Sequence, residues 1–328
     1  MLNFFRGTAL RSIIEAASPV AIDVGSRGGI DRDLEPIAWA VSAWGFEPDP
    51  EAFESLGKGD AGPWKELHHL PAAIGAGTGQ RELHVPRSPE GASLLRHDPA
   101  IGRAFAYPDL FEIERVLPVS TLGLDEAIAK YGVPAPSFIK LDVEGAELEI
   151  LEGATAALES AVAIKTEVSF LPHRLGQPLA SEIASFLLER RFVLMDFIRP
   201  HRWRRYSTTA APYVGREQIP FSAGQLSQGD YLFFRDPELL KASDEPTLQR
   251  SLCSASIALC YGFFDHAYAL LRSEPLRALV SERYSLDPLS EIARASRRYG
   301  RRVALQAARA HLRDLIPLAR SVFRTLAR

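Results

Sequence analysis

The sequence predicts an α/β protein with a mostly parallel sheet and helices on both of its faces. Short apolar runs alternate with helical patterns from residue 19 to about residue 198, as in successive strand–helix–strand units. The chain has 328 residues, which suits one large domain with an appendage, or two domains. Hydrophobic residues make up 46% of it and charged residues 24%, which excludes a wholly disordered or fibrous chain.

Each predicted element follows from a local pattern. Apolar runs of strand length occur at Val20–Val24, Val41–Phe46, Glu66–Ile74, Ser137–Val143, Val162–Val168, Phe192–Ile198 and Tyr231–Arg235. Helical spacing occurs at Pro50–Leu56, Leu124–Tyr131, Leu148–Leu158 and Leu179–Arg190. Glu82–Val85 predicts a small hairpin after a glycine-rich turn. The segment Pro86–Pro118 contains five prolines and fits no single element, and so long a connection is typical of a functional lid.

The charge is unevenly distributed. The net charge of −3 excludes a global basic field that attracts nucleic acid. Residues 291–328, however, hold ten arginines against Glu291 and Asp314, a local net charge of +8. After Asp236-Pro237 the sequence becomes helical and rich in Ala and Arg, with no further strand pattern. We therefore predict two parts, residues 1–236 and a helical, Arg-rich extension at residues 237–328.

The end of this extension has the pattern of a basic amphipathic helix, which Pro317 is expected to kink or divide. The apolar residues at spacings of three and four are Leu305, Ala308, Leu312, Leu315, Ala319, Val322 and Leu326. Beside them runs a stripe of Arg302, Arg309, Arg313, Arg320 and Arg324. The favoured interpretation is that the apolar face packs on the domain or on the partner of a homodimer. The alternative is peripheral contact with an anionic membrane.

The cysteines and the apolar runs favour a cytoplasmic protein. Cys253 and Cys260 are the only cysteines, and on one helix they would be roughly 10 Å apart along the axis, too far for a disulfide. The first residues lack the uninterrupted apolar core of a signal peptide. The most apolar later run, Ser251–Phe264, is shorter than the roughly 20 residues that a membrane span needs.

Two motifs predict a nucleoside site. After the first strand comes Asp23-Val-Gly25-Ser26-Arg-Gly28-Gly, where glycines allow close approach of a ligand. Because its order differs from G-x-G-x-x-G, a nucleoside with a compact polar tail fits better than a pyrophosphate, and a plain turn is the alternative. About 24 residues after Asp23, the next strand ends in Glu47-Pro48. An acidic residue at this place accepts both ribose hydroxyls, although a lone glutamate there is more often a solvated acid.

The third motif places charged residues on predicted central strands, which are normally apolar on both faces. Lys140, Asp142 and Glu144 alternate in Ile139-Lys-Leu-Asp-Val-Glu-Gly-Ala-Glu, and Lys165 and Glu167 follow on the next strand. Such groups are costly unless they are paired or face a cleft. For the lysines, a purely structural ion pair is a serious alternative to a functional role, for example between Lys140 and Glu167. For Asp142 we expect a functional role, because it follows the carboxyl end of its strand.

Together these residues resemble the FkbM family of S-adenosylmethionine-dependent methyltransferases. The resemblance runs from about Val20 to Arg235 and depends above all on the segment that begins at Ile139. Four shorter segments support the resemblance by their order and spacing: Ala73-Ile-Gly, Thr121-Leu122, Glu167-Val-Ser-Phe and Gly229-Asp-Tyr-Leu-Phe-Phe. The sequence departs from the family pattern at Gly123, which interrupts the usual Thr-Leu-Asp run. The resemblance does not extend into residues 237–328.

The resemblance implies the class I methyltransferase fold, a Rossmann-like three-layer sandwich with a seven-stranded sheet whose final strand is antiparallel. It implies S-adenosyl-L-methionine as cofactor, and we expect no metal ligands among the site residues. The expected cofactor-binding residues are Asp23, Gly25, Ser26, Gly28, Glu47, Pro48, Ala73, Ile74 and Asp142. The expected catalytic residues are Asp142, Glu144, Glu167 and Lys140.

The predicted reaction is methyl transfer to a hydroxyl of a sugar, glycan or natural product, with a base within reach of the hydroxyl. Asp142, Glu144 and Glu167 are the candidates for this base, and Asp142 could instead contact the donor's amino group. His173 is a less favoured base, and His173 and His97 are both expected to be bystanders. A magnesium site at Asp142, Glu144 and Glu147 is the less favoured reading, because Glu147 is expected to begin a helix. Two other functions are weighed: an NAD-dependent oxidoreductase, and a non-catalytic module with a membrane- or partner-binding tail.

Overall fold

A computed structural model describes residues 4–57, 61–105, 107–205, 210–214, 217–220, 224–241 and 244–326. Its centre is a seven-stranded sheet of order β3-β2-β1-β7-β8-β12-β9. These strands are β1 (Val20–Val24), β2 (Ser42–Phe46), β3 (Glu66–Leu70), β7 (Phe138–Leu141), β8 (Ala163–Ser169), β9 (Phe192–Trp203) and β12 (Gln225–Arg235). Only β12 runs antiparallel, between β8 and β9. The predicted sheet and its antiparallel last strand are confirmed.

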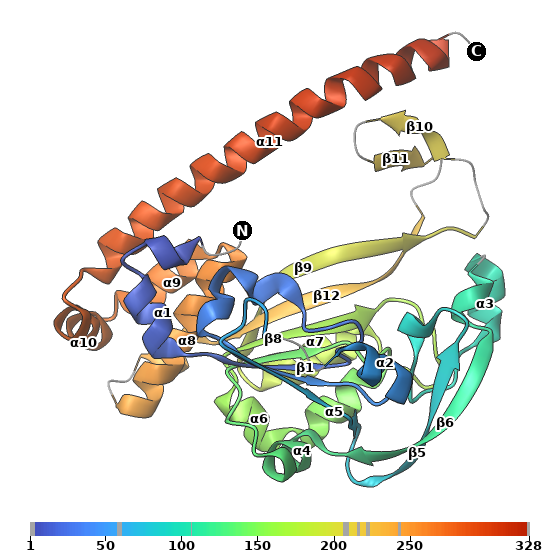
Figure 1. Cartoon of the computed structure of the whole chain (residues 1–328), viewed down its shortest axis with the longest axis horizontal. Coiled ribbons are helices and arrows are strands. Elements are labelled where there is room, and N and C mark those ends of the chain that lie inside the picture. Colours follow the sequence, from blue (N-terminus) through green and yellow to red (C-terminus); the bar gives the residue numbers. More distant parts are fainter. Residues whose placement is uncertain are drawn as a thin grey trace.

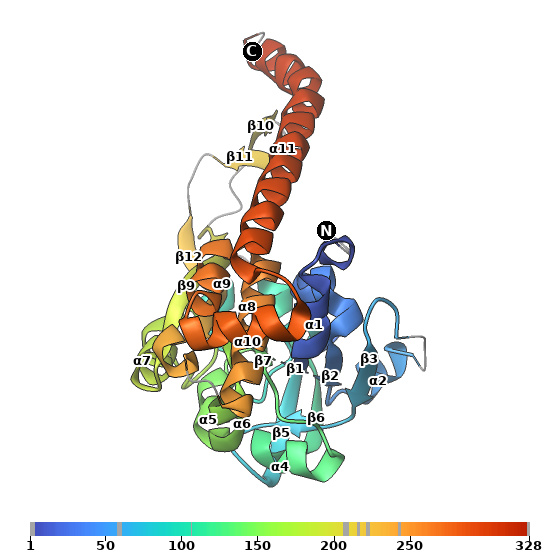
Figure 2. The same ribbon diagram turned by 90° about the vertical axis from the view of Figure 1, so that its left-hand side faces the viewer.

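Helices cover both faces of this sheet and complete three layers (Figures 1 and 2). Neighbouring residues along a strand point to opposite faces, so Ala21 and Phe138 pack on one side and Ile22 and Ile139 on the other. The first side is covered by α1 (Arg11–Ala17), the 3₁₀ helix η2 (Arg32–Ala40), α8 (Glu245–Tyr261) and α9 (Phe264–Leu271). The second is covered by α4 (Leu124–Tyr131), α5 (Glu147–Gly153), α6 (Thr155–Ser160) and α7 (Ala180–Glu189).

A smaller sheet, of order β4-β6-β5, lies beside the main one. It consists of β4 (Ala73–Ile74), β5 (Gly79–Pro86) and β6 (Ile113–Leu122). Two expectations are corrected here. The run Glu66–Ile74 forms two strands in different sheets, because Pro71 separates them and has no N–H for a ladder. The second correction concerns the expected small hairpin at Glu82–Val85. This segment belongs to β5, which pairs with the ten-residue β6, and Pro118 lies within β6 opposite Glu82.

The remaining elements connect these layers. They are α2 (Pro50–Ser55), α3 (Pro99–Phe105), the 3₁₀ turns η1 (Phe5–Gly7), η3 (Pro89–Gly91), η4 (Pro108–Leu110) and η5 (Pro237–Leu240), and the hairpin β10 (Ala210–Val214) with β11 (Glu217–Pro220). The predicted helix Leu148–Leu158 is two helices, α5 and α6. A Cβ at Gly153, the last residue of α5, would lie 2.9 Å from the carbonyl oxygen of Ala76. Gly153 thus permits a close contact where the first helix ends.

The C-terminal region consists of α8, α9, α10 (Glu274–Tyr284) and the long α11 (Pro288–Leu326). α8 and α9 share one apolar cluster with α1 and with Leu232 and Phe234 of β12. The division of the chain at residue 236 stays a prediction, and in the structure the helices after this point supply a layer of the sandwich. α11 continues through Pro317, so the proline does not divide it. Both cysteines lie on α8, buried and unpaired.

Candidate active site

A pocket of about 360 Å³ opens at the carboxyl ends of β1, β2 and β7. The order of the strands reverses between β1 and β7, and such a switch point is where open α/β sheets bind ligands. Its apolar lining includes Phe46, Pro48, Ala73, Ile74 and Leu83. Its polar lining includes the carboxylates of Glu47, Asp142, Glu144 and Glu167. The pocket therefore combines a surface for a flat apolar group with several fixed acceptors.

The glycine motif forms the turn between β1 and η2. Gly25 has a φ of +87°, and Gly28 and Gly29 have φ values of +79° and +116°, which glycine adopts without the steric cost of a Cβ. The backbone N–H groups of Gly25 and Ser26 both donate to the carbonyl of Phe46, at 3.1 and 3.0 Å. Gly25 lines the pocket, whereas Ser26 and Gly28 lie outside its described lining.

Glu47 is held in place directly after β2. Its side chain is buried, and Oε1 accepts the backbone N–H of Asp49 at 2.8 Å. Burial raises the pKa of Glu47, and the hydrogen bond from Asp49 and the charge of Arg27 act in the opposite direction. Arg27 also lines the pocket and binds Asp49 at 2.6 Å. Apart from its place inside the glycine motif, no feature of the sequence pointed to this role of Arg27.

Lys140 of β7 pairs with two carboxylates at the base of the pocket. Its Nζ lies 3.0 Å from Oδ1 of Asp23 and 3.3 Å from Oδ2 of Asp142. Asp23 and Lys140 are partners in the register of β1 and β7, which explains their contact. Asp23 is buried and absent from the described pocket lining, and it also accepts the N–H of Asp31 at 2.7 Å. The expected pair of Lys140 with Glu167 is thus wrong.

The pKa shifts of Lys140 and Asp23 are both consistent with this ion pair. Burial works against the charge of Lys140, but Asp23 and Asp142 outweigh burial and raise the pKa of the lysine. Burial raises the pKa of Asp23, and Lys140 partly offsets that rise. Lys140 is therefore a permanent cation that fixes the position of Asp142.

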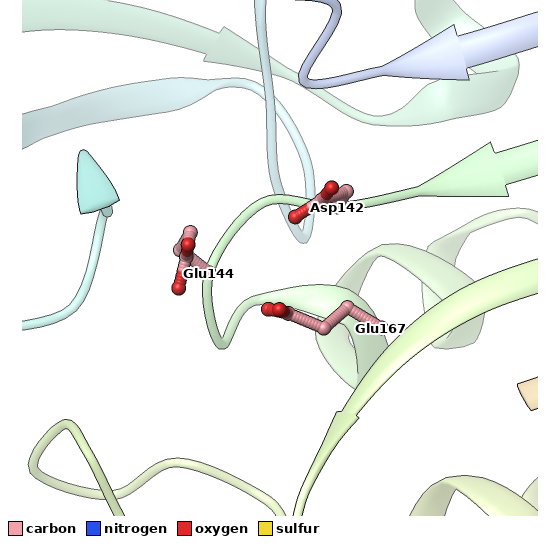
Figure 3. Close-up of side chains that lie close together, drawn as sticks. All are labelled: Asp142, Glu144 and Glu167. Atoms are coloured by element: carbon pink, nitrogen blue, oxygen red, sulfur yellow. The ribbon is translucent and has the colours of Figure 1, made fainter. Parts of the chain in front are cut away.

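Three carboxylates meet beside this cation. Oxygens of Asp142, Glu144 and Glu167 lie within 4.8 Å of one another, and Figure 3 shows Glu167 reaching from β8 toward the loop that carries the other two. The strand expected over Ser137–Val143 ends at Leu141, and Glu144 has a φ of +60°. The loop turns where the strand stops, so the proximity of Glu144 to Glu167 comes from this turn and not from alternation along β7.

Glu144 and Glu167 each have a protein partner. Glu144 forms an ion pair with the buried Arg174, and its carbonyl accepts the hydroxyl of Ser93 at 2.8 Å. Oε1 of Glu167 accepts the side-chain N–H of Gln228 at 2.6 Å. Burial, followed by the charges of Glu144 and Asp142, raises the pKa of Glu167 well above its ordinary value. Glu167 is consequently a group of high proton affinity next to the pocket.

Glu147 does not lie where it could share a magnesium ion with Asp142 and Glu144. It begins α5, as expected, and its carboxylate accepts the N–H of Val143 at 3.0 Å and that of Gly145 at 3.0 and 3.1 Å. It therefore holds the loop rather than facing the pocket. The oxygen-only set that does lie together, Asp142, Glu144 and Glu167, suits a hard cation, and it also suits proton transfer.

His97 and His173 are buried and lie outside the described pocket lining. His97 Nε2 is 2.9 Å from the carbonyl of Gly91. His173 stacks on Trp203 with ring centroids 4.5 Å apart, and its Nε2 is 2.8 Å from Oγ of Ser227. Burial lowers the pKa of His97 to about 4 and that of His173 to about 3. The structure gives both rings packing roles.

Lys165 forms a second, deeper ion cluster. Its Nζ lies 2.7 Å from Asp31, 2.6 Å from Asp33 and 3.4 Å from Asp230. The lysine is almost fully buried, and Asp31 also lines the pocket. The sequence pointed to Lys165 but not to these three partners. The segment expected to act as a lid contributes Glu90, Ala92, Ser93 and Leu94 to the pocket wall.

Comparison with known proteins gives a family match and two curated relatives. The methyltransferase FkbM domain matches residues 25–194, more than half of the chain. The hexuronic acid methyltransferase AglP of Haloferax volcanii is 27% identical over 162 residues, 48% of this chain and 60% of that protein. The 2-O-methyltransferase NoeI of Sinorhizobium fredii is 25% identical over 162 residues, 48% of this chain and 66% of that protein. The matched region thus spans less than two thirds of either relative.

A solved structure, the C-terminal domain of precorrin-6Y C5,15-methyltransferase from Rhodobacter capsulatus, is 12% identical and superposes with a TM-score of 0.31 over 68% of this chain and 86% of that one. The strand order of the present sheet is by itself that of a class I methyltransferase. From the domain match over residues 25–194, the chain belongs to the FkbM family of methyltransferases.

Proposed function

We propose that the protein transfers the methyl group of S-adenosylmethionine to a hydroxyl oxygen of a sugar or glycan. The observation that carries the proposal is one pocket lined by Glu47, by several apolar side chains and by the carboxylates of Asp142, Glu144 and Glu167. The family match supports methyl transfer. It does not support the NAD-dependent oxidoreductase or the non-catalytic module that the sequence left open.

The residues present fit the donor. Glu47 is a buried, oriented carboxylate at the end of β2, where it suits two ribose hydroxyls. Pro48, Ala73 and Ile74 form an apolar surface that suits the adenine ring. Asp142, whose Oδ2 lies 3.3 Å from Nζ of Lys140, suits the donor's amino group. When bound, the donor supplies a methyl group that its sulfonium already activates, so the chain has to position the acceptor and exclude water.

Glu167 is our candidate for the base. An acceptor hydroxyl must lose its proton near the transition state, and a base works best when its pKa lies close to the working pH. Burial and two neighbouring carboxylates raise the pKa of Glu167, whereas Glu144 is engaged by Arg174. Glu167 would accept the proton of the hydroxyl while its oxygen bonds to the methyl carbon, the bond from that carbon to sulfur breaks and S-adenosylhomocysteine leaves. Gln228, hydrogen-bonded to Oε1, orients that carboxylate.

The charge of the pocket favours a neutral acceptor. Glu90, Asp142, Glu144 and Glu167 line the pocket, and Glu144 is paired with Arg174 and Asp142 with Lys140. A carboxylate on the acceptor would meet Glu90 and Glu167, whereas the cations described in the lining, Arg27 and Lys140, already have carboxylate partners of their own. We therefore expect an ether from a sugar hydroxyl rather than a methyl ester from a uronic acid.

Calorimetry and a transfer assay test the proposal. S-adenosylhomocysteine is expected to bind, whereas NAD and buffer alone give no heat. Radiolabelled methyl from S-adenosylmethionine is then followed onto a panel of neutral glycosides and uronic acids, with Asp142→Asn as the inactive control. Binding of NAD in preference to S-adenosylhomocysteine would overturn the enzyme class, and methylation of uronic acids alone would overturn the acceptor class.

A further inference from the structure

α11 divides into an anchored and a projecting part. At its start, Ile292 and Ala295 are buried in the C-terminal cluster. Tyr299 follows, with its ring 5.8 Å from that of Phe4 and 5.2 Å from that of Phe264. The first turns of α11 therefore pack on the domain, but the expected packing of Leu305, Leu312 and Leu315 on it is wrong, because these side chains are exposed.

Beyond Tyr299 the helix rises away from the body of the protein, and both views show its far half beside the hairpin β10–β11 (Figures 1 and 2). Large apolar side chains are exposed along it: Leu305 is 60% exposed, Leu312 66% and Leu315 56%. Their spacings of seven and three place them on one stripe of the helix. This chain leaves that stripe uncovered among the residues the structure describes.

A row of arginines accompanies the apolar stripe. Arg302, Arg309 and Arg313 are exposed, and none has an ion-pair partner within the described ranges of the chain. In the sequence of residues 291–328 only Glu291 and Asp314 oppose ten arginines, and Glu291 is already bound by Arg294 at 2.7 Å. The projecting helix thus presents an apolar stripe with an adjacent unneutralised basic row.

A second copy of the helix is a poor occupant for this surface. In a two-stranded coil with Leu305, Ala308, Leu312 and Leu315 in its seam, the flanking positions would hold Arg302 and Arg309 on one side and Ala304 and His311 on the other. No acidic residue stands at these positions to pair across the coil, and residues 291–328 of each copy carry a net charge of +8. Self-association would therefore bring like charges together.

An anionic lipid surface complements both features. We propose that the projecting part of α11 lies in the plane of an anionic membrane, with its leucines among the acyl chains and its arginines on the lipid phosphates. From Val303 to Leu326 it is about 36 Å long, and helices with one apolar and one basic face bind at such interfaces. Among the described residues no helix is long and apolar enough to cross a bilayer. This inference does not depend on the proposed methyl transfer.

Sedimentation of the full chain with vesicles tests it. Vesicles with about one third phosphatidylglycerol in phosphatidylcholine are compared with pure phosphatidylcholine at about 0.1 M and about 0.5 M sodium chloride. The protein is expected to bind only the anionic vesicles and to leave them at high salt. Substitution of Arg302, Arg309 and Arg313 by Ala is expected to weaken partitioning on the order of 100-fold. Alanine at Arg11, Arg190 and Arg272, which removes the same charge elsewhere, is the matched control.

The apolar stripe is tested with Leu312→Asp combined with Leu315→Asp, and Leu188→Asp combined with Leu239→Asp, also exposed, serves as control. The first pair is expected to abolish binding and the second to retain it, both with unchanged melting. Equal binding to neutral vesicles, or equal loss in the controls, would overturn the proposal. So would a stable dimer in analytical ultracentrifugation that the Leu312 and Leu315 substitutions convert to a monomer.

Discussion

Gly25 packs directly against the carbonyl oxygen of Asp142: a Cβ built on Gly25 would lie 1.9 Å from that oxygen. The contact joins the carboxyl end of β1 to the carboxyl end of β7, the two strands that border the pocket. The N–H of Gly25 meanwhile donates to Phe46 at the end of β2. This glycine is therefore required for three strand ends to converge, before any ligand is considered.

Gly25→Ala is expected to destabilise the fold by more than about 3 kcal/mol, because a backbone atom blocks the Cβ and the φ of +87° is unfavourable as well. Gly28→Ala is the matched control: its φ is +79°, but no atom lies within 4 Å of the added Cβ. That substitution should cost only about 1–2 kcal/mol. Urea denaturation measures both, and equal losses would contradict the packing role of Gly25.

Glu47→Ala is expected to weaken binding of S-adenosylhomocysteine by about 1–3 kcal/mol, through loss of charge-assisted hydrogen bonds to the ribose. Calorimetry measures the dissociation constant, and circular dichroism checks the fold. Glu54→Ala, an exposed glutamate on α2, is the control and should leave binding unchanged. An unchanged dissociation constant in folded Glu47→Ala would remove Glu47 from the donor site.

Glu167→Gln is expected to lower kcat by about 100-fold or more while the affinity for S-adenosylhomocysteine stays the same. The base must be ionised, so the wild-type rate should rise with pH through the raised pKa of Glu167, and the variant should lack this limb. Gln228→Met removes the hydrogen bond to the carboxylate and should move the limb to higher pH. A wild-type pH profile in Glu167→Gln would assign the base elsewhere.

His173 is expected to make the protein less stable in acid. Its pKa is lowered to about 3 in the folded chain, so below the unfolded value of about 6.5 the unfolded state binds more protons. Stability from this group is complete above that value and falls as the pH decreases, by roughly 2–3 kcal/mol at about pH 4.5. Denaturation of His173→Gln should show a shallower slope against pH. His201→Gln, an exposed control, should keep the wild-type slope.

The strands of the sheet, and the edge of the sheet at which the pocket lies, could be predicted from the sequence alone. Val20–Val24 was predicted with the bounds that the structure has, because an apolar run between turn residues indicates a buried strand. Parallel strands bring their carboxyl ends to one edge. Gly25, Glu47 and Asp142, which follow three such strands, therefore line one pocket although they are far apart in the chain.

Tertiary structure decided where the elements break and which strand pairs with which. Pro118 argues against a strand when it is read locally, yet it lies in β6 opposite Glu82. The start of α5 at Glu147 followed from local sequence, whereas the end of that helix depends on the approach of Ala76 to Gly153. Contacts of this kind join residues that no periodic pattern connects.

The partners of the buried charges were also decided by tertiary structure. Lys140 and Lys165 are neighbours in register on β7 and β8, and the sequence pattern predicted the same environment for both. In the fold, Lys140 pairs with Asp23 and Asp142, and Lys165 with three aspartates from other segments. Sequence periodicity shows that a charge on a central strand needs a partner, because an unpaired buried charge is costly. The choice of partner depends on distances through space, which only the packed chain determines.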